Sequence, residues 1–199
     1  MKNELEYFRV GNAWGGYQEW FHDPMMRLGG CAAVTACDSC IYFDLHYGTR
    51  LYPYSLQNIT KRDYVRFGMK MKPYLRPRWH GIDRLDIYID GFGEYLSEQG
   101  CGTVLMEGFS GENPCLRAQE VLRQQIDSGL PVPCLTLHHT NPAFRDYDWH
   151  WFLLTGYELR NDRCMVKIIT YGSARWLDFE SLWDTGASPK GGLIRYRLA

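Results

Sequence analysis

The sequence lacks the features that would assign it to a membrane, to a secretory route or to a nucleic acid. No apolar run approaches the roughly 18–20 residues that a membrane span needs. The opening segment, MKNELEYFRVGN, has no apolar stretch of the kind found in secretory signals. The formal net charge is only −1, which gives no basic excess to attract nucleic acid or anionic lipid. We therefore expect a cytoplasmic protein with no membrane or nucleic-acid partner.

The cysteines do not form a disulfide or zinc pattern. Their number, seven, is odd, and a chain of 199 residues can bury a core without disulfides. Reduced thiols in the cytoplasm are the simplest interpretation. Cys37 and Cys40 form a C-x-x-C pair, but no second cysteine pair completes a zinc site, and both lie on one predicted helix. The sequence therefore predicts no metal and no other cofactor.

The composition is that of an ordinary globular protein, with 45% hydrophobic and 23% charged residues. Aromatic residues are frequent, at 15%, which fits either aromatic packing or a cleft lined by rings. The length suits one domain, residues 1–199. We expect a helical part over about residues 1–128 and a sheet part over about residues 129–199.

Hydrophobic periodicity and turn residues define the expected elements. Residues 1–30 contain several glycines and a proline and predict a loop-rich entry. Helices come first and an antiparallel sheet dominates the second half, which predicts the α+β class. The expected helices cover residues 31–46, 60–75, 82–98, 115–128 and 178–183. The expected strands cover residues 101–108, 131–137, 149–157, 165–170, 175–177 and the C-terminal segment GGLIRYRLA, with a hairpin turn at Arg160–Arg163.

Cys31 is the candidate nucleophile. It follows Gly29-Gly30 and precedes a run of small and apolar residues, a pattern that predicts a loop feeding directly into a buried helix. Cys31 then lies in the first turn, where free backbone N–H groups and the helix dipole favour a thiolate. The alternative is that Cys31 is a packing residue, because cysteine is one of the most buried residue types.

A thiol nucleophile needs a base and a donor for the oxyanion. Among the six histidines, His150 begins a predicted strand of bulky apolar residues, which would fix its ring. A histidine in that setting is more often a structural residue than a base. The role of His150 therefore depends on what else the sequence places with it.

Four segments in a fixed order resemble the papain-like cysteine peptidases, and most closely the bacterial C39-like group. They are Gln18, the G-G-C-A-A of residues 29–33, the segment QIDSGLPVPCL and the segment DWHWFLLTGYE. The resemblance implies that Cys31 starts the central helix, that His150 is the base and that Gln18 supplies an oxyanion-hole donor. It covers both ends of the chain but not residues 44–110.

The sequence departs from this family at the third catalytic position. The family carries an Asn or Asp after the strand that follows the histidine, whereas residues 168–173 contain neither. Thr170 falls nearest that position, and its hydroxyl can accept a hydrogen bond from the imidazole but brings no negative charge. Asp148 or Asp178 could replace the missing residue only if folding brings it close to His150.

We therefore expect a single α+β domain of papain-like architecture that acts as a cysteine-nucleophile hydrolase. Cys31 would attack the carbonyl of a peptide or an amide-containing small molecule, and His150, Gln18 and Thr170 would assist. Two alternatives remain: a degenerate papain-like domain that binds a peptide or ligand without turnover, and an acyltransferase that uses the same Cys-His chemistry. The sequence does not define the oligomeric state.

Overall fold

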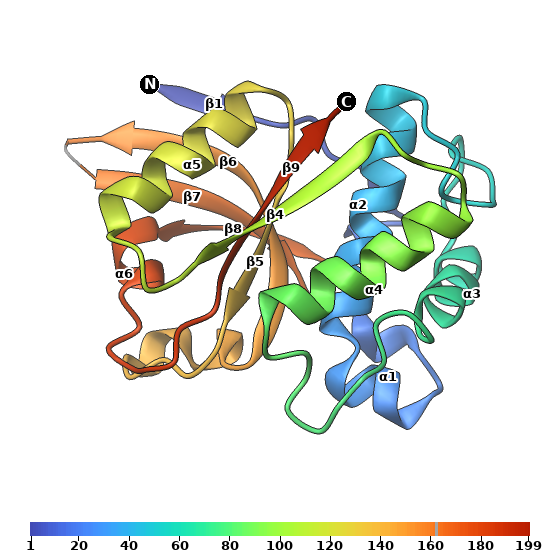
Figure 1. Ribbon diagram of the computed structural model, residues 1–199, viewed down its shortest axis with the longest axis horizontal. Helices are drawn as coiled ribbons and strands as arrows, with labels where there is room; N and C mark the ends of the chain where they lie inside the picture. The colour runs from blue at the N-terminus through green and yellow to red at the C-terminus, as the bar shows by residue number, and fades with distance from the viewer. Residues whose placement is uncertain (162) are drawn as a thin grey trace.

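Helices and an antiparallel sheet make up the structure, a computed structural model that describes residues 1–161 and 163–199 (Figure 1). The predicted α+β class is confirmed. The predicted hairpin turn at Arg160–Arg163 includes Asp162, which lies outside the described residues. No helix in the described residues is long and apolar enough to cross a membrane.

Except for the first, the helices lie close to the ranges that the sequence predicts; the first lies in the segment 1–30, which the sequence predicts to be loop-rich. They are α1 (Pro24–Gly29), α2 (Cys31–Tyr47), α3 (Lys61–Met71), α4 (Leu85–Glu98), α5 (Cys115–Asp127) and α6 (Phe179–Trp183), with 3₁₀ turns η1 (Gln18–Trp20) and η2 (Pro142–Tyr147). In Figure 1, α1 to α4 form a group on the right, and α5 crosses in front of the sheet on the left.

Local sequence signals set two of these helix boundaries. The Thr60 hydroxyl accepts a hydrogen bond from the Asp63 N–H at 3.1 Å, which confirms Thr60 as the N-cap of α3. Gly129 follows α5 with a φ of +77°, and its N–H donates to the Ile126 carbonyl while the Leu130 N–H donates to that of Gln125. This arrangement is a Schellman motif, for which glycine is favoured because it adopts positive φ without strain.

Helix α2 is the centre of the helical group. All but one of its residues from Cys31 to Asp44 are buried, Val34 being the exception. Ala32, Ala33 and Ala36 keep the helix thin enough for neighbours to pack closely around it. A helix that is buried on all sides carries no amphipathic stripe, which explains why an uninterrupted small and apolar run marks it in the sequence.

One sheet of seven strands contains most of the β structure. Its order is β4-β9-β5-β6-β7-β8, with β1 pairing β6 beyond the end of β5, and all pairings are antiparallel. The strands are β1 (Lys2–Glu4), β4 (Val104–Ser110), β5 (Val132–Thr136), β6 (His150–Arg160), β7 (Arg163–Thr170), β8 (Ser173–Asp178) and β9 (Gly192–Leu198). A separate small ribbon joins β2 (Arg9–Val10) and β3 (Ala13–Trp14).

The helical and sheet parts do not separate at residue 128 as the sequence suggests. Strand β1 lies at the N-terminus and β4 lies between two helices, yet both belong to the main sheet. The first pairs with β6 and the second with the C-terminal strand β9. Strand pairing over such separations in sequence leaves no local signal, because it depends on where the chain returns.

Candidate active site

Cys31 is the first residue of α2, and only 3% of it is exposed. Gly30 caps the helix and α1 ends at Gly29, so the chain passes from one helix into the next without a loop. Both glycines are required by close packing, since a Cβ at Gly29 would overlap the Arg78 carbonyl oxygen and one at Gly30 that of Met26. The two glycines therefore place the sulfur at the start of the helix.

His150 is the first residue of β6, and it contacts the third residue that the sequence predicts. Its Nε2 lies 2.6 Å from the Thr170 Oγ1 at the end of β7, and both residues are buried. The imidazole stacks on the Tyr171 ring, with centroids 4.4 Å apart and an angle of 11° between the planes. The His150 ring also stacks on Phe152, with centroids 6.0 Å apart, so the fold holds it by a hydrogen bond and by stacking contacts.

Three segments meet around the sulfur of Cys31. The backbone N–H of Trp151, the second residue of β6, lies near enough to this sulfur to lower the pKa of the thiol. A Cβ at Gly81 would lie 3.8 Å from the same sulfur and 3.4 Å from the Trp149 carbonyl oxygen. The Trp151 indole Nε1–H donates to the Ile82 carbonyl at 2.6 Å. The N-terminus of α2, the start of β6 and the loop before α4 therefore enclose the thiol together.

Burial controls the ionisation of both groups. It raises the pKa of the Cys31 thiol, although the nearby backbone N–H groups of Trp151, Ala32 and Cys31 itself lower the pKa in part. Burial also lowers the pKa of His150 to about 3. Both shifts favour a neutral thiol and a neutral imidazole. Desolvation therefore outweighs the preference for a thiolate that the helix N-terminus gives.

Gln18 lies in η1, half-buried, and its amide is already engaged. The Nε2 group donates to the Arg27 carbonyl at 2.8 Å, which ties η1 to the helix that leads into Cys31. Its neighbour Tyr17 meets Tyr171 edge to face, with centroids 5.9 Å apart. Among the described contacts, none joins the Gln18 side chain to Cys31 or His150; one of its amide hydrogens is used by Arg27 and a second is not used by this bond.

Strained backbone flanks the histidine and the threonine. Among the described residues, the non-glycine residues with positive φ are Trp149 at 54°, Asn161 at 45° and Tyr171 at 51°. Asparagine tolerates this conformation well, whereas bulky residues adopt it rarely. Trp149 directly precedes His150, and Tyr171 directly follows Thr170. Strain of this kind clusters at functional sites, where the surrounding structure has to hold it.

Neither aspartate considered as a substitute for the third residue contacts His150 in the described contacts. The Asp148 carboxylate accepts from the His139 N–H at 3.0 Å and lies 3.2 Å from the His138 Nδ1. The Asp178 carboxylate accepts from the Ser181 N–H at 2.8 Å and caps α6. Thr170 is thus the hydrogen-bond partner of His150, and the site has no carboxylate beside its imidazole among these contacts.

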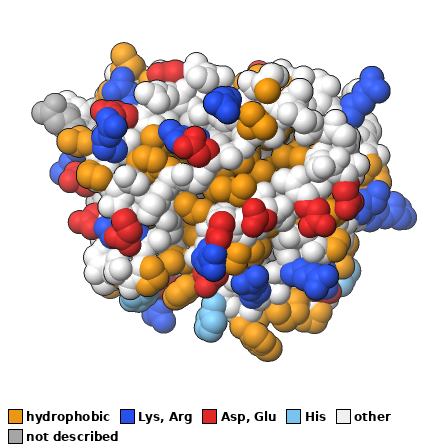
Figure 2. Space-filling view, in the orientation of Figure 1, with side chains coloured by type: hydrophobic (Ala, Val, Ile, Leu, Met, Phe, Trp, Pro, Cys, Tyr) orange, Lys and Arg blue, Asp and Glu red, His pale blue; other side chains and the backbone are white. Residues whose placement is uncertain are grey.

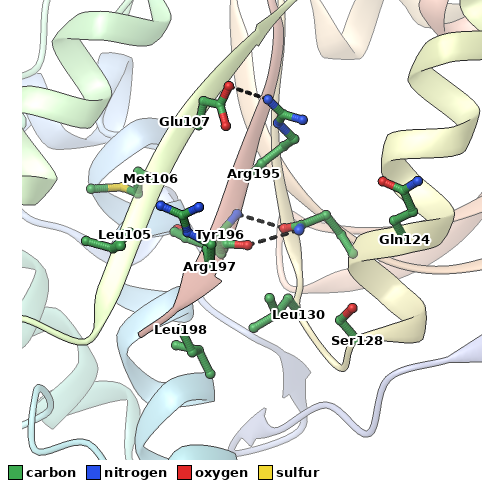
Figure 3. A pocket seen from close by; sticks show the side chains of 11 residues that line it. Leu105, Met106, Glu107, Gln124, Ser128, Leu130, Arg195, Tyr196, Arg197 and Leu198 are labelled. Carbon is green, nitrogen blue, oxygen red and sulfur yellow. Dashed lines mark hydrogen bonds and ion pairs between the residues drawn. The ribbon is translucent and has the colours of Figure 1, made fainter.

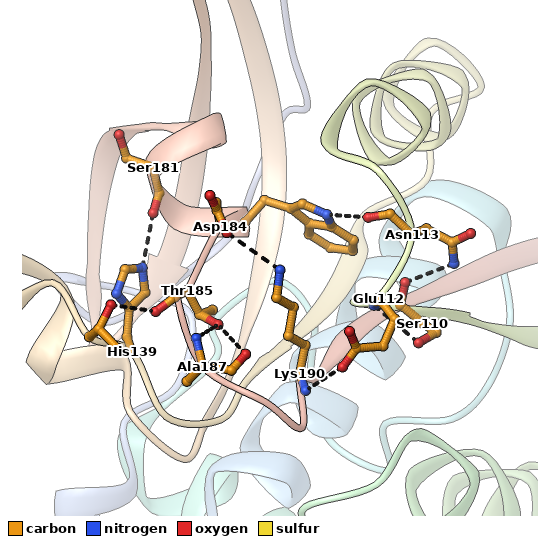
Figure 4. Close-up of polar contacts among 11 residues, drawn as sticks. Ser110, Glu112, Asn113, His139, Ser181, Asp184, Thr185, Ala187 and Lys190 are labelled. Carbon is orange, nitrogen blue, oxygen red and sulfur yellow. Dashed lines mark hydrogen bonds and ion pairs between the residues drawn. The ribbon is translucent and has the colours of Figure 1, made fainter.

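An open cavity of about 470 Å³ lies beside Trp149, the residue before His150. Leu135 and Leu137 of the β5 region and Asp83 at the end of the 76–84 loop line it, together with Lys190 and its neighbours. The loop that carries Lys190 is held in place by polar contacts (Figure 4). Its Lys190 N–H donates to Glu112, and the Trp183 indole donates to the Asn113 carbonyl.

A second hollow, of about 500 Å³, lies between α5 and the β4–β9 pair and contains none of the predicted catalytic residues (Figure 3). The Gln125 side chain crosses it to bond the Tyr196 backbone, donating to the carbonyl at 2.9 Å and accepting from the N–H at 2.7 Å. Arg195 pairs with Glu107 at the same place. The Gln125 contacts satisfy backbone groups of β9 where this strand is no longer paired with β5.

Asp38 is a buried polar residue that the sequence reasoning missed. It lies in α2, and its carboxylate accepts from the Tyr7 hydroxyl at 2.8 Å, the Tyr64 hydroxyl at 2.6 Å and the Gly16 N–H at 3.0 Å. Burial raises its pKa to about 6, although these hydrogen bonds oppose the shift. An acidic residue inside an otherwise small and apolar helix was the available signal, because a buried charge requires partners.

Comparison of the chain with protein-family models, with curated proteins and with solved structures gives no significant match. The site must therefore be judged on its own geometry. Over residues 1–161 and 163–199, no three His, Cys, Asp or Glu side chains are grouped as a metal site requires. Cys37 and Cys40, the predicted C-x-x-C pair, are free buried thiols inside α2.

Proposed function

We propose that this protein is a papain-like cysteine hydrolase of the peptidase or amidase type, with Cys31 as nucleophile. The observation that carries the proposal is the meeting of the α2 N-terminus with the start of β6. There the Cys31 sulfur lies near the Trp151 N–H, and His150, one residue earlier, is hydrogen-bonded to Thr170. The strained residue Trp149, directly before His150, supports the same assignment.

The proposed reaction begins with a neutral pair. In the tautomer that donates from Nε2 to Thr170, the Nδ1 of His150 has a free lone pair and can accept the thiol proton. The sulfur of Cys31 attacks the substrate carbonyl and forms a tetrahedral oxyanion, which the Cys31 N–H and the free amide hydrogen of Gln18 stabilise. The proton then passes from His150 to the leaving amine as the carbon–nitrogen bond breaks.

Water completes the reaction. His150 takes a proton from water, and the resulting hydroxide attacks the thioester. The carbon–sulfur bond breaks to release a carboxylic acid, and His150 returns its proton to the sulfur to restore the Cys31 thiol. Thr170 orients the imidazole but adds no charge to stabilise the imidazolium. We therefore expect slower turnover than a site with Asn or Asp at this position would give. The substrate, a peptide or an amide-containing small molecule, would enter through the cavity beside Trp149.

Acylation by p-nitrophenyl acetate tests the proposal. The expected result is a burst of nitrophenolate and an acetyl group on Cys31, located by mass spectrometry of its peptide. Cys31→Ala should abolish the burst, and His150→Gln should slow it by about 10²-fold or more, the contribution of a general base. Cys134→Ser is the matched control, because Cys134 is equally buried, 3% exposed, but lies in strand β5.

The same experiment separates the two alternatives. An acetyl-Cys31 that persists in water but is discharged by an added amine would identify an acyltransferase. No adduct on Cys31 at any pH would contradict the enzyme and favour a binding domain that has lost catalysis. The neutral Cys31 and His150 and the uncharged Thr170 are the observations that keep this second candidate open.

A further inference from the structure

We propose that the open edge of β4, with the groove between β4 and α4, is a docking site for an extended peptide that carries basic side chains. This inference goes beyond the proposed hydrolase. It rests on the backbone of an edge strand, on an apolar groove beside it and on the charge of the helix that forms the other wall.

Strand β4 presents unused backbone groups. It lies at the end of the sheet and, among the described residues, pairs only with β9. The Ala199 N–H donates to the Thr103 carbonyl at 2.9 Å, which makes the odd-numbered residues of β4 the ones that bond to β9. Met106 and Gly108, which are not buried, therefore direct their N–H and C=O groups to the open edge, and the hydrogen bonds of the described residues include none to these groups. An extended peptide satisfies such groups by adding a strand.

An apolar groove of about 520 Å³ lies beside this edge. Its lining is apolar or glycine except for one serine, and it comes from α4, from β4 and from the turn between them: Ile89, Gly93, Leu96, Ser97, Gly100, Cys101, Gly102, Val104, Leu105 and Met106. Figure 2 shows the corresponding band of hydrophobic side chains crossing this face of the molecule. In an added strand, alternate side chains would point into this groove.

The charge of α4 indicates which kind of peptide would bind. Helix α4 carries Asp86, Asp90, Glu94 and Glu98 at spacings of four residues, which form an acidic ridge. Figure 2 shows a row of acidic side chains over this helix, along the border of the apolar band. Asp90 and Glu94 form no ion pair among the described residues. A bound peptide would therefore gain most from Lys or Arg at its outward positions.

A second copy of this chain is the less suitable occupant. Its own β4 has the sequence VLMEGFS, which contains Glu107 and no basic residue. Pairing two β4 edges would place acidic ridges beside each other without a compensating charge, and like charges across an interface are unfavourable.

Three fluorescein-labelled peptides test the proposal, each with valine at alternate positions and with lysine, glutamine or glutamate at the others. Fluorescence anisotropy should show that the lysine peptide binds, that added salt weakens it, and that the glutamate peptide binds at least about tenfold more weakly. On binding, amide hydrogen exchange should slow at Met106 and Gly108, the residues whose N–H groups face the open edge.

Gly108→Pro removes an edge N–H that the sheet does not use and should abolish binding. Gly108→Ala is its matched control, because an added Cβ meets its nearest neighbour at 3.5 Å and the N–H stays. Exchange of both Asp90 and Glu94 for lysine should reverse the preference to the glutamate peptide, and this surface change keeps the test valid if the proline variant does not fold.

Three results would overturn the proposal: no binding of the lysine peptide, binding that ignores its charge, or binding that Gly108→Pro leaves intact. Dimerisation of the parent that Gly108→Pro abolishes would assign the edge to a second copy instead. These variants lie outside the Cys31 site and should form the acetyl-Cys31 adduct at the parent rate. Failure of the proposed docking site is therefore distinguishable from failure of the proposed hydrolase.

Discussion

Helix α2 contributes to two buried polar clusters that are built in opposite ways. Around Asp38, two tyrosine hydroxyls and the Gly16 N–H donate to one carboxylate. Around Cys31, at the helix start, the His150 ring has one hydrogen bond, to Thr170, in the described contacts, and strained residues flank it. The first cluster joins the N-terminal segment, α2 and α3. The second cluster contains the Cys31 thiol and one nitrogen of the His150 imidazole that has no hydrogen bond in the described contacts. The N-terminus of α2, the start of β6 and the loop before α4 enclose it.

The difference between the two clusters indicates which buried polar groups have a structural role and which have a chemical one. A buried group with all its partners stabilises one conformation, whereas one with unused hydrogen-bonding capacity in a strained setting costs stability and is kept where function requires it. We therefore assign Asp38 to the architecture and the Cys31–His150 region to the proposed chemistry. Four predictions test this contrast, in decreasing order of expected effect.

Removing the Asp38 carboxylate should cause the largest loss of stability. Asp38→Ala leaves the Tyr7 hydroxyl and the Gly16 N–H without this acceptor, whereas the Tyr64 hydroxyl can still donate to the Val34 carbonyl at 3.1 Å. Each unsatisfied buried group costs about 1–3 kcal/mol, so we expect a loss of roughly 2 kcal/mol or more in the free energy of unfolding. Urea denaturation measures this value. Asp38→Asn, which retains an acceptor oxygen, should lose less, and Cys31→Ala should lose about 1 kcal/mol. Equal losses of unfolding free energy for Asp38→Ala and Cys31→Ala would contradict the assignment of a structural role to Asp38 and a chemical role to Cys31.

The two clusters should act with opposite sign on the pH dependence of stability. The pKa of Asp38 in the folded state is about 6, above its ordinary 3.8. Between these two pH values the folded state binds more protons than the unfolded state, so the contribution of Asp38 to the unfolding free energy falls as pH rises. His150 has a folded pKa of about 3, below its ordinary 6.5, so its contribution rises over pH 3–6.5.

Single substitutions separate the contribution of Asp38 from that of His150. Relative to the parent, Asp38→Asn should make the unfolding free energy rise more steeply from pH 4 to 6, and His150→Gln should make it rise less. Each unit of pKa shift corresponds to about 1.4 kcal/mol. Urea denaturation at a series of pH values provides the measurement. A His150→Gln profile parallel to the parent would show that the imidazole is not held neutral by burial.

Tyr171 should control the ionisation of His150 with little effect on stability. Tyr171 and Gly172 both have positive φ, at 51° and 67°, as in a type I′ turn, where Asn-Gly is favoured. Tyr171→Asn therefore suits the turn but removes the stacked ring, and the pKa of His150 should rise towards 6.5 with a stability change below about 1 kcal/mol. NMR titration of the imidazole measures the shift. Tyr171→Phe retains the ring and should leave the pKa of His150 low.

The smallest effect should come from the loop over Cys31. Gly81 and Gly48 have φ values of +69° and +66°, so alanine at either position should cost about 1–2 kcal/mol in backbone strain. Gly81 lies near the Cys31 sulfur, whereas a Cβ added at Gly48 would have no neighbour within 4 Å. Only Gly81→Ala should accelerate iodoacetamide labelling of Cys31. Equal labelling rates in both variants would show that this loop does not shield the thiol.

Local patterns predicted much of the fold. Glycines before small residues placed the start of α2 at Cys31, Thr60 predicted the N-cap of α3, and Gly129 predicted the end of α5. The position of Thr170 next to His150 followed from motif order and was found in the structure, while the catalytic roles of both remain predictions. Each of these features depends on residues close in the sequence or on a resemblance that preserves their order.

Contacts between distant segments could not be predicted in this way. The pairing of β4 with β9, the donors around Asp38 and the stacking of Tyr171 on His150 join parts of the chain that carry no shared local signal. The ionisation of Cys31 is the clearest case, because the helix N-terminus favours a thiolate while burial by β6 and the 76–84 loop favours the thiol.

The sequence by itself determined the α+β class, the helix that starts at Cys31 and the residue types available for catalysis. Only the tertiary structure decided which groups are desolvated, which are fully hydrogen-bonded and which strand lies at the edge of the sheet. The physical reason is that backbone preference is a property of neighbouring residues, whereas desolvation and strand pairing depend on every segment that packs around a group.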